Sequence, residues 1–251
     1  MIQVKNVIKS FDDKTILHSV DATFHDGKTN LIIGQSGSGK TVLMKSIVGL
    51  VTPENGEISY DGRDLLKMNT NQKKELRKEI GMLFQGSALF DSETVLGNVM
   101  FPLVMFTKMT QAEMRDRALF CIERVNLKGA DKKYPSELSG GMQKRVAIAR
   151  AIAMNPKYLF CDEPNSGLDP QTSIVIDNLI SDITKEYNIT TIINTHDMNS
   201  VMEIGEKIVF IYEGEKWWEG SKDDILHADN KELGDFVFAS AMAKRARSAS
   251  K

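Results

Sequence analysis

An eight-residue segment constrains this chain more than any other feature: residues 34–41, with the sequence GQSGSGKT. The segment fits the phosphate-binding pattern G-x-x-x-x-G-K-[ST]. The run before it, residues 29–33, is typical of a buried strand, and residues 41–48 are typical of the start of a helix. A glycine-rich turn between a strand and a helix directs backbone N–H groups and the positive helix end at one point. We therefore predict that a nucleoside triphosphate binds there.

Two residues of this segment have predicted roles of their own. The Lys40 ammonium would contact the β- and γ-phosphates, and the Thr41 hydroxyl would join the coordination of Mg²⁺. The predicted nucleotide-binding residues of the segment are Gly34, Gln35, Ser36, Gly37, Ser38, Gly39, Lys40 and Thr41.

Composition narrows the class of protein. A chain of 251 residues can form one large core, or a core with a subdomain. The formal charge of -2 offers no electrostatic argument for a nucleic-acid partner. We expect no membrane span, since no apolar run approaches about 20 residues, and the first residues lack the pattern of a secretory signal. Cys121 and Cys161 lie in apolar surroundings and are predicted to be buried free thiols.

The order of predicted elements indicates an α/β fold with a helical insert. Two antiparallel strands precede the phosphate-binding segment, a helical stretch occupies about 95–155, and strands and helices then alternate. The elements expected are strands at 2–8, 15–24, 29–33, 57–60, 80–84, 157–162, 190–195 and 206–212, and helices at 71–79, 111–125, 142–154, 170–187 and 198–204.

Two carboxylates end the predicted strand at 157–162. Asp162 at the strand end could orient Mg²⁺ and its waters, as the corresponding acid does in phosphate-loop enzymes. Neighbouring strand residues alternate in direction, so Glu163 is expected to face the other way. There it could polarise the water that attacks the γ-phosphate. The alternative is a solvated strand end with two acids.

His196 follows the predicted strand at 190–195. Beside a nucleotide it could donate a hydrogen bond to the γ-phosphate and keep Glu163 and the attacking water in line. A lone histidine at a strand end is more often structural, and here the neighbouring motifs favour the catalytic interpretation. The other histidines, His18, His25 and His227, are expected at the surface or in structural roles.

The segment LSGGMQ at residues 138–143 resembles the signature motif of the nucleotide-binding subunits of ABC transporters, and the similarity extends over nearly the whole chain. Ser139 would cap a helix that begins with the amides of Gly140 and Gly141. The resemblance implies that these three residues contact the ATP held by a second copy of the chain. It therefore implies a dimer with two ATP molecules between the subunits, and ATP and Mg²⁺ as the cofactors.

Further positions match the family one by one. Phe11 occupies the place of the aromatic residue that stacks on adenine, with a core phenylalanine as the alternative. Gln85 stands where the family has a glutamine that contacts Mg²⁺ or water and links the core to the helical insert. Asp169 lies in the loop that communicates across the dimer. The departures, Met142, Asn165 and Val42, remove no catalytic group, so we expect an active ATPase.

The resemblance implies one ABC ATPase domain over residues 1–251. It is a phosphate-loop NTPase core with an N-terminal antiparallel β subdomain and an inserted α-helical subdomain. The core is expected at 1–85 and 156–220, and the insert at 86–155. A C-terminal helical extension with a basic tail is expected at 221–251. The tail carries four positive charges over 243–251. It is expected to be solvated, or else to contact a neighbouring subunit or anionic lipid.

The segments 84–103 and 135–142 are similar to those of the ATPases of Mce-type lipid transporters, including the system that maintains outer-membrane lipid asymmetry. This likeness implies a phospholipid cargo, a separate integral membrane permease, a Mce-type lipid-carrying protein, and a position at the cytoplasmic face of the inner membrane. Amino-acid and methionine importers have related segments and form the alternative, as does a soluble assembly-type ABC ATPase. No nucleic-acid partner is implied.

The region from Gln85 to Pro102 is the expected contact with the permease, since the family couples Gln85 to the position of the insert. Apolar residues are numerous there, and we expect at least two of four to pack inside the insert instead. The four are Leu89, Phe90, Phe101 and Leu103.

Overall fold

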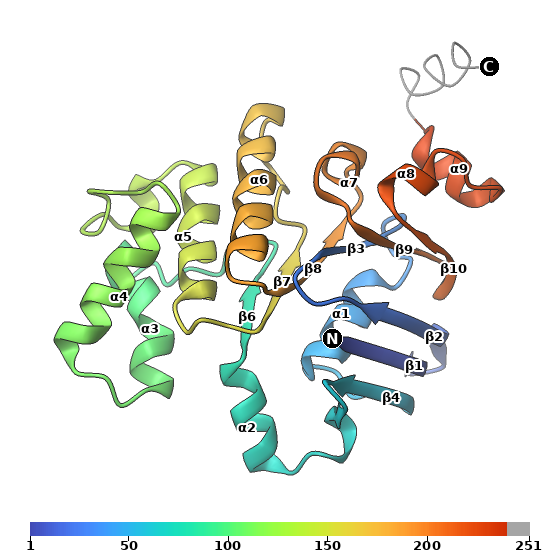
Figure 1. Ribbon diagram of the computed structural model, residues 1–251, viewed down its shortest axis with the longest axis horizontal. Helices are drawn as coiled ribbons and strands as arrows, with labels where there is room; N and C mark the ends of the chain where they lie inside the picture. Colours follow the sequence, from blue (N-terminus) through green and yellow to red (C-terminus); the bar gives the residue numbers. More distant parts are fainter. Residues whose placement is uncertain (240–251) are drawn as a thin grey trace. The chain divides into compact units, whose positions relative to one another are not determined.

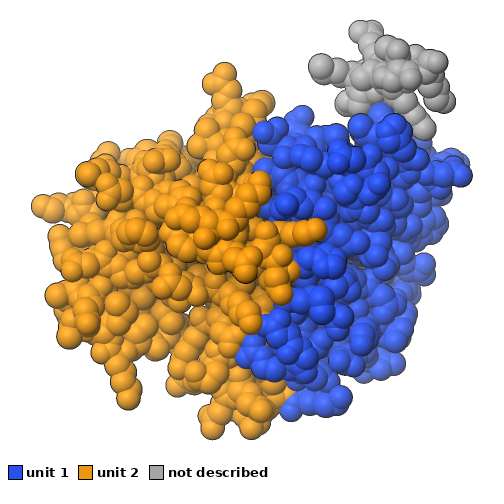
Figure 2. Space-filling view, viewed as in Figure 1, with its two compact units in different colours: residues 1–25, 29–67, 194–251 blue, residues 26–28, 68–193 orange. Residues whose placement is uncertain are grey.

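The chain divides into two compact units in the computed structural model, which describes residues 1–239. The first unit contains Met1–His25, Thr29–Lys67 and the chain from Asn194 onward, and the second contains Asp26–Lys28 and Met68–Ile193 (Figure 2). Helices and strands are labelled as in Figure 1. The predicted division into core, insert and extension is not equivalent to these units and stays a prediction.

An antiparallel sheet in the first unit has the strand order β2-β1-β4-β5. At one end of these strands, Ile2 of β1 lies opposite Phe24 of β2 and Tyr60 of β4, and all three side chains are fully buried. The two strands predicted before the phosphate-binding segment are therefore present, and both are longer than expected. The strands are β1 (Ile2–Phe11), β2 (Lys14–Phe24), β4 (Asn55–Tyr60) and β5 (Arg63–Asp64).

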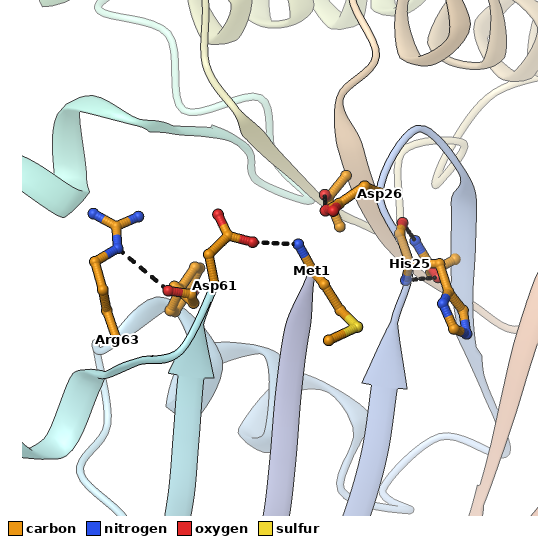
Figure 3. A network of polar contacts seen from close by, with 8 residues as sticks. Met1, His25, Asp26, Asp61 and Arg63 are labelled. Atoms are coloured by element: carbon orange, nitrogen blue, oxygen red, sulfur yellow. Dashed lines mark hydrogen bonds and ion pairs between the residues drawn. The ribbon is translucent and has the colours of Figure 1, made fainter.

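Polar contacts hold the edge of this sheet where β1 begins and β4 ends (Figure 3). The ammonium of Met1 donates to the Asp61 carboxylate over 2.6 Å. The Arg63 guanidinium donates to the Tyr60 carbonyl over 3.2 Å. At the end of β2 the His25 amide donates to the Asn30 side chain over 2.8 Å, which ties this strand to the start of β3.

Three further strands of the first unit position the phosphate-binding segment. The buried strand β3 (Thr29–Ile33) pairs in parallel with β9 (Lys207–Tyr212), and β10 (Glu215–Gly220) pairs antiparallel with β9. Helix α1 (Lys40–Val48) follows the segment and ends at Gly49, which adopts a φ of 78°. The Tyr60 hydroxyl donates to the Ile47 carbonyl of α1 over 2.7 Å. The unit also contains α7 (Met198–Ile204), α8 (Lys222–Ile225), α9 (Lys231–Val237) and a 3-10 turn at Leu65–Lys67.

The second unit contains a pair of parallel strands. In β6 and β7, Ile80 pairs with Tyr158 and Leu83 with Cys161. Strand β8 begins in this unit next to β7 and ends in the first unit. The elements here are α2 (Thr70–Lys78), β6 (Ile80–Leu83), β7 (Tyr158–Asp162), α6 (Pro170–Glu186) and β8 (Thr190–Thr195).

Three helices of the second unit form the predicted helical region (Figure 1). Helix α3 (Val95–Phe106) packs against α4 (Gln111–Arg124) and α5 (Gly140–Ile152). Each begins at a capping side chain, because Thr94, Thr110 and Ser139 each accept a hydrogen bond from a backbone amide of the first turn. A 3-10 turn at Pro135–Glu137 precedes α5.

Both cysteines are free and buried, as predicted. Burial raises the pKa of Cys121 to about 11 and raises that of Cys161 further.

His18, His25 and His227 are exposed. In the part of the chain that the structure describes, no helix is both long and apolar enough to cross a membrane. The basic tail at 243–251 lies outside the described residues.

Candidate functional site

The phosphate-binding segment forms the turn between β3 and α1 in the first unit. Gly34, Gly37 and Gly39 have φ values of 151°, 82° and 105°, which L side chains rarely adopt. A Cβ at Gly34 would lie 2.2 Å from the Ile211 carbonyl oxygen, and one at Gly39 would lie 2.9 Å from the Leu17 side chain. Glycine is therefore required at these two positions both by backbone conformation and by space.

The Lys40 ammonium closes this turn. Its Nζ donates to the carbonyls of Gly34 at 2.8 Å and Gln35 at 2.9 Å, and the residue is only 6% exposed. A buried lysine requires acceptors, and the turn supplies them from its own backbone. The ammonium thus lies inside the loop that it closes, at the first residue of α1.

The side chain of Ser38 indicates what the loop can bind. Its backbone is occupied, because its N–H donates to the Gln35 carbonyl at 3.2 Å and its carbonyl accepts from the Gly214 amide at 3.1 Å. Its Oγ is buried, yet it has no hydrogen-bond partner among the described residues. A buried hydroxyl left in this state costs about 1–3 kcal/mol. A phosphate oxygen in the loop would satisfy it, so the cradle fits a phosphorylated ligand.

Two other predicted site residues belong to the first unit. Phe11 ends β1 and is 46% exposed, so the alternative of a core phenylalanine is wrong. The Lys9 ammonium lies 4.9 Å from the centre of the Phe11 ring. His196 is exposed between β8 and α7, where Asp197 caps α7 by accepting the Asn199 amide at 2.9 Å. Adenine stacking by Phe11 and a γ-phosphate contact by His196 stay predictions.

The carboxylates at the end of β7 differ in backbone conformation. Asp162 is the last strand residue and is buried, whereas Glu163 has a φ of 48° and is half-buried. A non-glycine residue in the left-handed region is strained by roughly 1–2 kcal/mol. The direction of the Glu163 side chain therefore depends on a strained turn, and not on the strand alternation used to predict it. Such strain is frequent at active sites.

Gln85 follows β6 in the second unit and is exposed. Its side-chain amide donates to the Ser166 hydroxyl over 3.4 Å, and its backbone carbonyl accepts a hydrogen bond from the Lys144 ammonium. Burial lowers the pKa of Lys144, while Cys161, Glu163 and Asp162 act in the opposite direction. Sequence reasoning missed Lys144, although a lysine within the mostly buried stretch of α5 was a detectable signal.

The predicted signature motif begins helix α5. The Ser139 hydroxyl accepts the Met142 amide at 3.3 Å. A Cβ on Gly141 would lie 2.5 Å from the methyl group of Thr172, whereas one on Gly140 would lie 3.6 Å from Leu168. Gly141 therefore permits the first turn of α5 to lie directly against the first turn of α6.

Asp169 begins helix α6 as its capping residue. Its carboxylate accepts the amides of Gln171 and Thr172, each at 3.0 Å, and the Thr172 hydroxyl at 2.5 Å. The hydrogen bond from the Thr172 side chain is the largest cause of the lowered pKa of Asp169. The structure thus brings the signature motif and the Asp169 loop together within the second unit, through Gly141 and Thr172.

Residues 17–166, more than half of the chain, match the protein-family model described as ABC transporter. The chain belongs to this family. It is an ATPase of the ATP-binding cassette type, with the α/β fold and helical region that the sequence predicted. A solved dimer of the ATP-binding cassette MJ0796 in a post-hydrolysis state with ADP and Pi is 33% identical. It aligns with a TM-score of 0.80 over 88% of this chain and 99% of that chain.

Three transport ATPases are similar to nearly the full chain. The probable ribonucleotide transport ATP-binding protein mkl of Mycobacterium leprae is 36% identical over 94% of this chain and 68% of its own length. The chain thus spans about two thirds of this relative. The intermembrane phospholipid transport ATP-binding protein MlaF of Haemophilus influenzae is 37% identical over 94% and 90%. The methionine import ATP-binding protein MetN of Carboxydothermus hydrogenoformans is 39% identical over 95% and 73%.

The contact between Gly141 and Thr172 predicts different outcomes for two neighbouring substitutions. Gly141→Ala should lower the free energy of unfolding by about 1–3 kcal/mol, because its methyl group overlaps Thr172. Gly140→Ala has room and should be neutral or stabilise by up to about 1 kcal/mol through helix propensity. Adding Thr172→Ser, which removes the obstructing methyl group, should restore the free energy of unfolding of the Gly141→Ala variant. Equal stability of the two alanine variants in urea denaturation would contradict this packing.

Proposed function

We propose that this chain is the ATP-hydrolysing subunit of a multi-subunit transporter that moves phospholipid between membranes through a separate permease. The glycine-rich cradle with the buried Ser38 hydroxyl supports the nucleotide part of this proposal. The likeness to MlaF over 90% of that protein supports the cargo. The subunit acts at the cytoplasmic face of the inner membrane, where the permease holds it.

ATP binds with its phosphates in the cradle of residues 34–41 and its adenine on the Phe11 ring. The donors available for Mg²⁺ are the Thr41 hydroxyl, the Asp162 carboxylate and the Gln85 side-chain oxygen. These are hard oxygen ligands of the kind that Mg²⁺ takes together with phosphate oxygens. When bound, the ion would neutralise charge on the β- and γ-phosphates.

Hydrolysis requires a base for the attacking water. Glu163 takes this role, because it places a half-buried carboxylate in the strained turn that follows β7. His196 donates to the γ-phosphate and keeps the water in line with it. Asp162 would bind the metal, whereas its neighbour Glu163 would act on the water.

A second copy of the chain completes each nucleotide site. Ser139, Gly140 and Asp169 are exposed at the starts of α5 and α6, where they are available to another molecule. In the dimer, Ser139 and the amides of Gly140 and Gly141 face the γ-phosphate held by the other copy. Asp169 links the two sites.

Substitutions at Lys40 and Glu163 should separate ATP binding from ATP hydrolysis. Lys40→Ala should weaken ATP binding by about 10- to 100-fold and abolish turnover, because a charge-assisted contact is lost. Glu163→Gln should retain ATP binding and lower kcat by at least about 100-fold, the contribution of a general base. Glu123→Gln, at an exposed position of α4, is the matched control. Normal turnover by Glu163→Gln in a steady-state ATPase assay would remove Glu163 from this role.

A shared site predicts complementation. Ser139→Arg alone should bind ATP as the isolated subunit does but fail to hydrolyse it, because the arginine fills the place of the second copy's phosphate. Mixing Ser139→Arg with Lys40→Ala subunits should restore part of the activity, since one of the two composite sites in each mixed dimer is intact. The measurement is ATPase rate against mixing ratio. Full activity of Ser139→Arg by itself would contradict the shared site.

An apolar surface on α3 supports the permease contact. Phe101, Val104 and Met105 are exposed there, and Phe90 is exposed beside them with its ring centre 4.6 Å from that of Phe101. We call these four residues the α3 surface. Leu103 is buried in the helical region, and Leu89 is half-buried. Leu103 therefore packs internally, as expected for part of the predicted set, while the α3 surface extends as far as Met105.

The loop before α3 is rigidly attached to this surface. The Asn98 side chain is fully buried, accepts the Phe90 amide at 2.8 Å and donates to the Phe90 carbonyl at 3.1 Å. It also donates to the carbonyls of Glu93 and Thr94. Phe90 is thus held in place on both sides of its own backbone. A preformed apolar surface of this kind suits a short amphipathic helix from the permease.

Matched substitutions test this surface and the cargo together. Val104→Asp should abolish co-purification with the permease in detergent and ATP-driven phospholipid transfer, because it places a charge in the contact, while ATP binding by the free subunit persists. Val175→Asp on α6 is the control, since the two valines are 53% and 52% exposed. Equal loss in both variants, or in neither, would remove the α3 surface from the contact.

The same complex distinguishes the alternatives. The 39% identity to MetN favours amino-acid import as the second candidate, and methionine uptake without phospholipid transfer would establish it in place of lipid transport. A subunit that co-purifies with no integral membrane protein would instead indicate an assembly-type ATPase. Lipid extraction from the purified complex should yield bound phospholipid, carried by a Mce-type partner.

A further inference from the structure

The loop that begins at Gln85 is held by two cations of the signature helix α5. The Lys144 ammonium donates to the Gln85 carbonyl, and Lys144 is only 4% exposed. Arg150 donates to the Ser87 carbonyl at 2.7 Å and to the Ala88 carbonyl at 2.6 Å. Three backbone carbonyls of one short loop thus accept hydrogen bonds from one helix.

The backbone of this loop requires such support. Ser87 and Ala88 have φ values of 61° and 47°, so two successive non-glycine residues are left-handed. Within the loop, the Ser87 amide donates to the Phe84 carbonyl at 2.9 Å and the Ala88 amide to the Gly86 carbonyl at 2.7 Å. Strained conformations persist where surrounding contacts hold them. Here those contacts come from α5.

The Gln85 side chain is held much less firmly than its backbone. Among the described residues, the side chain makes one hydrogen bond, the long 3.4 Å contact with Ser166, and the residue is exposed. The backbone is therefore anchored while the amide group remains able to exchange one partner for another. This is the arrangement expected of a ligand whose position is determined by an outer support.

We propose that Lys144 is a positioning residue for Gln85, which it ties to the helix whose first turn carries Ser139, Gly140 and Gly141. The position of the Gln85 amide then follows the position of α5. This inference rests on the proposed function, because it assumes that Gln85 reaches the metal or water of the nucleotide site. An apolar residue at 144 leaves the Gln85 carbonyl without its buried donor.

Hydrogen exchange tests the tether without using activity. In the full chain, Lys144→Met should speed exchange of the amides at 86–89 about tenfold, whereas Lys144→Arg, which keeps a cationic donor, should stay within about twofold of wild type. Lys132→Met, at an exposed lysine, is the control. Unchanged exchange in Lys144→Met would overturn the proposal. Equal acceleration of amide exchange in α4 would also overturn it, because it would show that the whole unit had been destabilised. If Lys144→Met does not fold, Lys144→Leu, which also lacks a donor, is measured against the same expectations.

A double-mutant cycle tests whether Lys144 acts through Gln85. Lys144→Met should lower kcat for ATP by about tenfold while KM stays within about twofold, and Lys144→Arg should recover most of the loss. In a Gln85→Ala background, Lys144→Met should change kcat by less than about twofold. If the loss of kcat in the double variant equals the product of the losses in the two single variants, the proposal is overturned. If Gln85→Ala alone has normal kcat, the assigned role of Gln85 fails, and the exchange data then report a tether without catalytic effect.

Discussion

The nucleotide cradle depends on a buried lysine that must find acceptors. Lys40 donates to the carbonyls of Gly34 and Gln35, and this requirement closes the turn between β3 and α1. The closure in turn demands glycine at positions 34 and 39, where any side chain would overlap a neighbouring segment. The chain's own contacts therefore shape the cradle, and they leave one of its hydroxyls, that of Ser38, buried without a partner among the described residues. A phosphate oxygen would supply the hydrogen-bond partner that this hydroxyl lacks.

The second unit also contains a buried lysine that donates to the backbone, but this lysine has a different role. Lys144 is also a buried lysine that donates to a main-chain carbonyl, but it joins residues 59 positions apart in the chain. Lys40 shapes its own loop, whereas Lys144 ties a loop to a helix. Three residues of this unit, Ser87, Ala88 and Glu163, have strained, left-handed backbone conformations. Strain of this kind is maintained where position matters more than stability.

Sequence reasoning succeeded where local physics decides the structure. The strand at 29–33 and the helix at 198–204 were predicted with their observed bounds, because a short run that ends in three apolar residues and a capped, periodic segment are local signals. It missed β10, whose residues alternate between exposed and half-buried and whose order comes from pairing with β9. It also assigned the direction of Glu163 to strand alternation, although the strand has already ended. Lys144 could not be paired with Gln85 from sequence, since only the fold brings them together.

The starts of α5 and α6 show why neighbouring helix ends serve different roles. Both present backbone N–H groups and the positive end of a helix. At α6 the Asp169 carboxylate accepts two of those amides and places a negative charge on the helix end, so that end is already neutralised. At α5 the cap is the uncharged Ser139, whose hydroxyl accepts one amide at the longer distance of 3.3 Å. Of these two helix ends, α5 therefore keeps its positive end for an anion from outside, which is what a γ-phosphate of a second copy would provide.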